Sequence, residues 1–160
     1  FGLVILNQVL VPYYAAYFKS KDSPFNLREK IKPNVRISFI LSLIVVLFLV
    51  LFGNTLLSWF GTYGENYTIG YTSMLILAFG QLFNVAFGST GYILTMAKKE
   101  SLVLISISCG IITNVTLNYL LLDDFGIKGA AIATSASIFV WNLMMLIFVK
   151  RKTGINPTIF

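Results

Sequence analysis

The sequence contains no histidine, a single cysteine and only six acidic residues, and charged side chains make up 11% of its 160 residues. Histidine is the usual general base and a frequent metal ligand, so its absence removes many catalytic designs. Cys109 has no partner for an internal disulfide, and its apolar surroundings indicate a small buried hydrophobe. The carboxylates fall between the apolar runs, and there is no glycine-rich phosphate loop. We therefore expect no catalytic residues, no metal site, no cofactor and no enzyme.

Apolar residues are present in unusual excess. They make up 57% of the chain, and the mean hydropathy is +0.82, whereas soluble domains are about a quarter charged. The composition predicts an all-α, polytopic membrane helical bundle that forms a single membrane domain over residues 1–160. The net charge of +6 comes from clusters between apolar runs. Membrane orientation explains such clusters, so we expect membrane lipids as partners and no nucleic acid.

Four apolar runs are long enough to cross a membrane, which requires about 20 residues. They cover residues 37–57, 74–96, 102–122 and 129–149. Residues 1–18 resemble the end of a further helix whose start is missing, so we expect N-terminal helices of the same protein as partners. Residues 19–36 are basic and are predicted to form a cytoplasmic loop. Ser23 followed by Pro24 is typical of a helix start, so a short surface helix and a solvated loop both remain open there.

Two predicted spans carry uncharged polar or small residues on one face. In residues 74–96 they recur at spacings of three and four, at Gln81, Asn84, Gly88, Gly91 and Thr95. In residues 102–122 they recur every four residues, at Ser106, Gly110, Asn114 and Asn118. Amide side chains in a bilayer either bond to neighbouring helices or line a polar path, and both interpretations remain open. Our candidate substrate-cavity residues are Gln81, Asn84, Thr95, Asn114 and Asn118.

The last span begins with small residues one turn apart. Gly129, Ala133 and Ser137 follow the small-xxx-small pattern that lets helix backbones approach closely. We interpret them as helix-packing residues rather than as a binding site. Asn142 stands among bulky neighbours in the second half of this span.

The distribution of Lys and Arg predicts the orientation. Eleven of the twelve basic residues lie in alternate loops, and only Lys128 lies in the others. Because basic loops remain in the cytoplasm, we expect a multi-pass protein of the cell (inner or plasma) membrane with a cytoplasmic C-terminus. Asp123 and Asp124 then form part of an outer turn. No carboxylate lies inside a span, so any proton-coupling group would have to come from another part of the protein.

Several motifs together resemble one transporter family. The run Gly126–Ser135, followed by Trp141-Asn142-Leu143 and a basic end, resembles the last helix of the polysaccharide (O-antigen, teichoic acid, capsule) flippases of the multidrug/oligosaccharidyl-lipid/polysaccharide exporter superfamily. Residues 77–84 with 91–96 are similar to the tenth helix of that family, and residues 114–122 are similar to its eleventh. The family often has a proline where Asp123 and Asp124 stand. The resemblance covers essentially the whole chain and the C-terminal part of such a transporter.

This resemblance implies both a fold and an activity. The chain would form part of the C-terminal lobe of a twelve-helix, two-lobe transporter. That transporter would flip a lipid-linked oligosaccharide across the membrane by alternating access, with polysaccharide synthesis enzymes as further partners. Three alternatives remain open: a cation-coupled multidrug or lipid II exporter of the same superfamily, a non-transporting membrane scaffold, and a fragment inactive by itself.

Overall fold

The computed structural model describes residues 24–60, 67–154 and 157–158. Within these residues it contains helices and no strand, and four helices are long and apolar enough to cross a membrane. This confirms the predicted all-α membrane bundle. The helix end expected at residues 1–18 lies outside the described residues.

The first described helix, α2, runs from Pro24 to Phe60 and is longer than the expected span. It starts at the proline that the sequence marks as a helix start, and it continues through Pro33 into the apolar run. The structure thus differs from the expected loop over the part of residues 19–36 that it describes. No glycine interrupts the sequence between Pro24 and the apolar run, so the basic segment extends the spanning helix.

The predicted span 74–96 is divided into two helices. A 3-10 turn, η1 (Tyr67–Gly70), leads into α3 (Tyr71–Ala86), and α4 (Thr90–Met96) follows after a break. At the break Gly88 has a φ of 71°, a left-handed conformation that residues with a side chain rarely adopt. A Cβ on Gly88 would also meet the carbonyl oxygen of Pro157. The expected single polar face from Gln81 to Thr95 therefore does not exist as one continuous helix face.

The last two helices form an antiparallel pair with almost no connection. Helix α5 (Glu100–Phe125) and helix α6 (Ile127–Thr153) are separated only by Gly126, which has a φ of 54°. Helix α6 ends at Gly154, a left-handed cap whose N–H donates to the carbonyl of Lys150.

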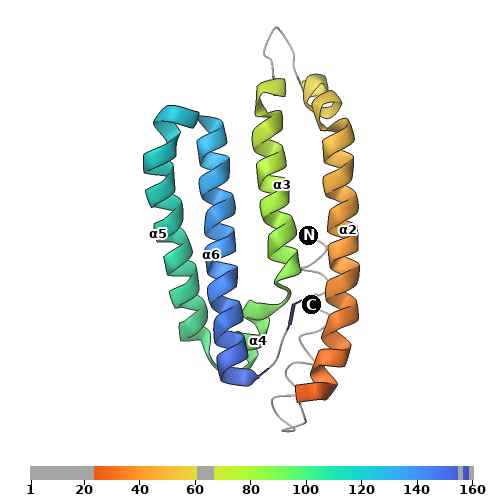
Figure 1. Ribbon diagram of the computed structural model, residues 1–160, viewed down its shortest axis with the longest axis vertical. Helices are drawn as coiled ribbons and strands as arrows, with labels where there is room; N and C mark the ends of the chain where they lie inside the picture. The colour runs from red at the N-terminus through yellow and green to blue at the C-terminus, as the bar shows by residue number, and fades with distance from the viewer. Residues whose placement is uncertain (1–23, 61–66, 155–156, 159–160) are drawn as a thin grey trace.

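The four long helices lie side by side in the order α5, α6, α3 and α2 (Figure 1). Helix α6 packs against both α5 and α3, whereas α2 packs mainly against α3 and η1. The short helix α4 packs against α5 and α6. Among the described residues, the four long helices therefore form a layer one helix thick, with α4 packed at one end of it.

Glycines allow close approach at the seams between these helices. A Cβ on Gly129 would meet the backbone carbonyl of Leu121, and a Cβ on Gly80 would lie 2.6 Å from the Oγ of Ser135. These glycines bring α6 close to α5 on one side and to α3 on the other. Close backbone approach is the usual source of packing energy between helices in lipid.

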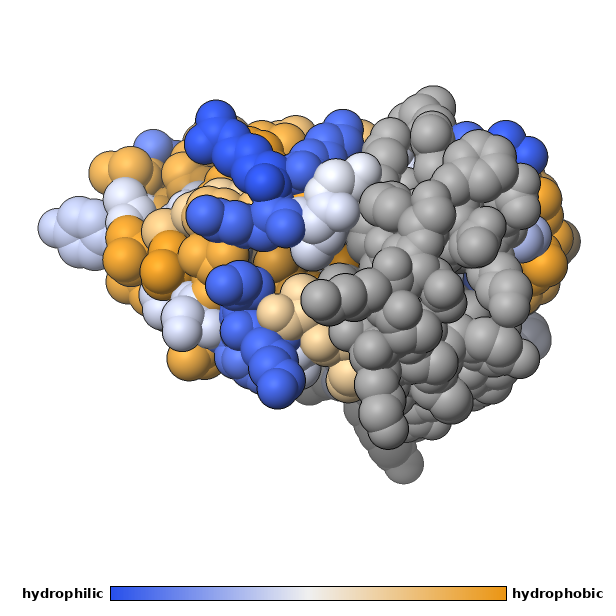
Figure 2. All heavy atoms as spheres, turned by 90° about the horizontal axis from the view of Figure 1, so that it is seen from below, coloured by the Kyte–Doolittle hydropathy of each residue, from blue (hydrophilic) through white to orange (hydrophobic). Residues whose placement is uncertain are grey.

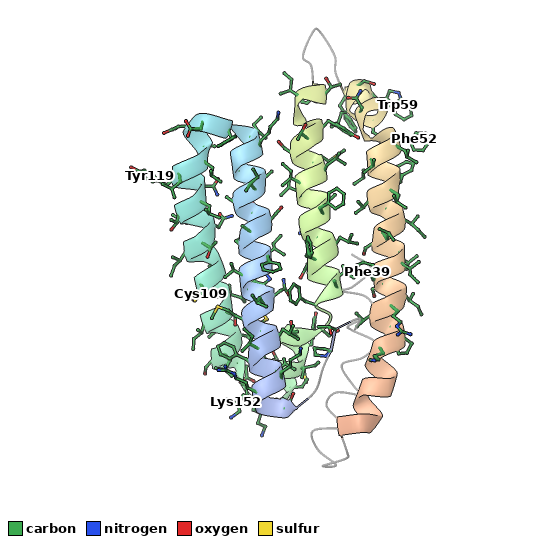
Figure 3. The ribbon with its side chains drawn as sticks, in the orientation of Figure 1. Phe39, Phe52, Trp59, Cys109, Tyr119 and Lys152 are labelled. Carbon is green, nitrogen blue, oxygen red and sulfur yellow. The ribbon has the colours of Figure 1, made fainter. Side chains whose placement is uncertain are left out.

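The ends of the layer differ in polarity. Figure 2 shows hydrophilic side chains gathered on the end seen from below, and Lys152 lies at this end in Figure 3. Trp59 and Tyr119 lie toward the opposite end (Figure 3). A small buried core near the basic end joins α2, α4 and α6 through Val35, Ile93, Leu94, Met145 and Val149. Most other large apolar side chains of α2 are exposed, as expected of a helix in contact with lipid.

Candidate functional site

A short chain of amide side chains connects α3 to α6. The Nδ2 of Asn142 donates to the Oδ1 of Asn84 at 3.0 Å and to the carbonyl oxygen of Ile138 at 2.8 Å. The Nδ2 of Asn84 in turn donates to the Oε1 of Gln81 at 3.3 Å. Asn142 is 4% exposed, whereas Gln81 is exposed. The chain thus runs from the buried seam to an open surface.

The same seam contains a second polar contact and a tight packing point. The Oγ of Ser135 donates to the carbonyl oxygen of Ile76 at 3.0 Å, next to the place where Gly80 meets α6. Cross-helix bonds of this kind contribute about 0.6 to 2 kcal/mol each in membranes. Two such bonds and a glycine contact therefore hold α3 on α6.

A parallel arrangement connects α5 to α6. The Nδ2 of Asn118 donates to the Oδ1 of Asn114 at 3.1 Å and to its carbonyl oxygen at 3.0 Å. The Nδ2 of Asn114 then reaches the Oγ1 of Thr134 at 3.4 Å, and Thr134 donates to the carbonyl of Ala130 at 2.9 Å. The two candidates on α5 are thus brought together, and the longer contact ties them to α6.

Both amide groups contact the same side of α6. Successive residues of an α-helix are about 100° apart around the axis. Thr134 and Asn142 are therefore about 80° apart around α6. Ile147, which is about 140° from each, marks the opposite side of the helix. We call the side of the layer that carries Gln81, Asn84, Asn114, Asn118, Thr134 and Asn142 the amide face.

The other side of the α3–α6 seam is aromatic. Phe139 makes edge-to-face contacts with Phe83 and Phe87, with ring centroids 6.0 and 5.6 Å apart. Phe139 lies beyond Asn142 around α6, on the side away from Thr134. The seam therefore has one polar and one aromatic flank, and the layer has two chemically different sides.

The other predicted residues are placed as follows. Thr95 lies on α4, is exposed and donates to the carbonyl of Gly91 at 2.9 Å, a bond within its own helix that does not connect it to the amide face. The three small residues predicted to pack helices, Gly129, Ala133 and Ser137, are buried, and Ser137 contributes its carbonyl oxygen where Gly110 approaches α6. Sequence reasoning did not select Asn142 and Thr134 as site residues, although both lie at helical spacing in the last span.

The amide face carries no titratable side chain among its members. Its groups are amides and a hydroxyl, which both donate and accept hydrogen bonds without a change of charge. Within the described residues, no group of three His, Cys, Asp or Glu side chains could hold a metal ion. The face is therefore suited to hydrogen-bonding an uncharged polar ligand.

Comparisons with known proteins place this architecture in a family. No curated protein and no solved structure matches the chain. The MatE family model matches residues 14–120, which is more than half of the chain. The match includes the whole of α2, α3 and α4 and most of α5, and the four candidate spans agree with a membrane transporter. The chain therefore belongs to the MatE family of membrane exporters.

Proposed function

We propose that this protein exports a lipid-linked oligosaccharide across the membrane for the synthesis of a cell-surface polysaccharide. The observation that carries the proposal is the amide face, an uncharged hydrogen-bonding surface on one side of a membrane-spanning layer. Sugars present many hydroxyl groups, and amides pair with hydroxyls as donors and as acceptors. The resemblance of the segments in α3 to α6 to polysaccharide flippases supports the same substrate class.

In this proposal the amide face borders the transport path. The opposite, aromatic side faces lipid or other helices of the protein. The bonds and glycine contacts at both seams of α6 favour movement of α3, α5 and α6 as one body. Rigid-body movement of one half of a transporter against the other is the common form of alternating access. The basic end would face the cytoplasm, because Lys and Arg concentrate there.

The amide side chains would bind the substrate by exchanging hydrogen bonds with one another for hydrogen bonds with its hydroxyl groups. Gln81 is exposed and, among the described residues, accepts one 3.3 Å bond from Asn84, so its amide group retains capacity for a ligand. Asn142 is buried and would hold Asn84 in position rather than touch the substrate. Gln81 is therefore the best candidate for direct contact on α3.

The test compares a substitution on the amide face with one on the opposite side of α3. Gln81→Leu removes the exposed amide. Phe79→Leu changes a side chain two residues away, about 200° around the helix, that is 47% exposed. We expect Gln81→Leu to lower surface polysaccharide at an unchanged membrane level of the protein, and Phe79→Leu to have little effect. Equal export by both variants would contradict the assignment of the amide face.

Two further measurements distinguish the remaining functions. Deletion of the gene should remove surface polysaccharide, whereas loss of drug resistance with normal polysaccharide would identify a multidrug exporter. Purified protein in liposomes should move a lipid-linked oligosaccharide between leaflets. Absence of translocation together with retained binding of polysaccharide synthesis enzymes would identify a scaffold.

A further inference from the structure

The side of α6 away from the amide face carries a regular apolar stripe. Phe139, Leu143 and Ile147 recur every four residues and are 42%, 38% and 40% exposed. Residues four apart share a helix face, and the next member of the series is Arg151. An exposed apolar stripe thus ends directly at an exposed cation.

The length of this stripe matches one leaflet of a bilayer. Twelve residues separate Phe139 from Arg151, which corresponds to about 18 Å along the helix at about 1.5 Å per residue. Half of a hydrocarbon core is about 15 Å thick. A lipid whose headgroup lies at Arg151 would therefore run its acyl chain along the stripe to the middle of the bilayer.

The cations at this end come from two separate parts of the chain. Lys150, Arg151 and Lys152 occupy the last turn of α6, and Lys98 and Lys99 connect α4 to α5; all five are exposed. The packing register brings the two groups to one level. Gly110 lies level with Trp141 and Gly129 with Leu121, so continuing this antiparallel register places Lys99 level with Arg151.

The helix dipole explains only one of these groups. Cations at the C-terminus of α6 are favourable, but Lys99 is the N-cap of α5, where a positive charge is unfavourable. Glu100 is the only acidic residue in the first turn of α5. An anion bound between the two groups would offset the repulsion among five positive charges.

We infer that the basic end of the α5–α6 pair binds an anionic phospholipid of the phosphatidylglycerol type, with its phosphate between Lys99 and Arg151 and an acyl chain along Phe139, Leu143 and Ile147. Each Lys or Arg near an anionic membrane surface contributes about fivefold to lipid affinity. The stripe of Phe139, Leu143 and Ile147 lies outside the arc of α6 between Thr134 and Asn142, so an acyl chain bound along it would not cover the amide face.

The test measures lipid retention by the purified protein. The protein is reconstituted in nanodiscs that contain equal amounts of phosphatidylglycerol and phosphatidylcholine, and the lipids that remain bound after extraction into detergent are quantified by mass spectrometry. We expect wild type to retain phosphatidylglycerol preferentially. Lys99→Gln combined with Arg151→Gln should lower that retention by about 25-fold. Lys128→Gln, at the opposite end of the layer, should not change it.

Several results would overturn the inference. One is equal retention of the two lipids by wild type, and another is an equal loss in the Lys128→Gln control. If the double variant does not assemble, the salt dependence of wild type decides: preference for phosphatidylglycerol must fall as ionic strength rises. A preference insensitive to salt contradicts the inference. Glycerophosphoglycerol is the headgroup without acyl chains. At the same concentration as the lipid it should not displace bound phosphatidylglycerol. Displacement would contradict the role of the apolar stripe in binding.

Discussion

The close contact between Gly129 of α6 and Leu121 of α5 predicts how adding one methyl group at Gly129 changes the stability of the protein. In Gly129→Ala the new Cβ would meet the carbonyl oxygen of Leu121 and lie 2.8 Å from its carbonyl carbon. Both are backbone atoms of α5, so they cannot rotate away and the seam must open. Overpacking of this kind costs about 1–3 kcal/mol, while the higher helix propensity of alanine returns at most about 1 kcal/mol. With the full alanine term subtracted, we expect a net loss of up to about 2 kcal/mol, a factor of up to about 30 in the folding equilibrium.

The measurement is thermal unfolding of the purified protein in detergent. A matched control is Gly91→Ala in α4, where the nearest neighbour of the new Cβ is the Sδ of Met145 at 3.4 Å, an ordinary contact. This control should be as stable as wild type or slightly more stable. If Gly129→Ala unfolds at the same temperature as Gly91→Ala, the seam is not closed as described and the reasoning fails.

Three other predictions follow from the same structure. Gly88→Ala should loosen the C-terminal segment, because the Cβ would face Pro157 at a φ of 71°, and limited proteolysis should detect earlier cleavage after α6; an unchanged cleavage pattern counts against the contact. Asn142→Leu should cost about 0.6–2 kcal/mol of stability, because a buried donor between α6 and α3 is lost, and denaturant unfolding measures this. For topology, Asp124→Cys in a Cys109→Ser background should react with an impermeant maleimide on intact cells; labelling only after permeabilisation would reverse the proposed orientation.

Much of the fold could be predicted from apolar length alone. Runs of more than twenty uncharged residues must form helices in a bilayer, and the helices α5 and α6 follow the last two runs closely. The break after Ala86 was not predicted, because Phe87, Gly88 and Ser89 are uncharged residues that also occur inside membrane-spanning helices. Its cause is tertiary. Gly88 accommodates the carbonyl of Pro157, a neighbour that helical periodicity does not reveal.

The candidate site was predicted only in part, because spacing shows which residues share a helix face but not which helices are neighbours. Spacing alone selected Gln81 with Asn84 and Asn114 with Asn118, since each pair lies within one turn, and the structure links the members of each pair by hydrogen bonds. Their role in transport stays a prediction. Thr95 was selected by continuing the series through the break, which the structure does not support. The partner Asn142 required knowledge of which helices are neighbours, and no local pattern contains that information.

The hydrogen bond from Asn142 to Asn84 also limits when α3 and α6 can assemble during synthesis of the chain. Its two residues are 58 positions apart in the chain, which corresponds to about 3–12 s of synthesis at about 5–20 residues per second. After α3 is synthesised, several seconds therefore pass before α6 supplies Asn142 as the partner of Asn84. During that interval the bond from Asn84 to Gln81 can satisfy one amide within the helix itself. The α5–α6 pair forms after a shorter delay, because Asn114 and Thr134 are only 20 positions apart and Gly126 alone separates the two helices.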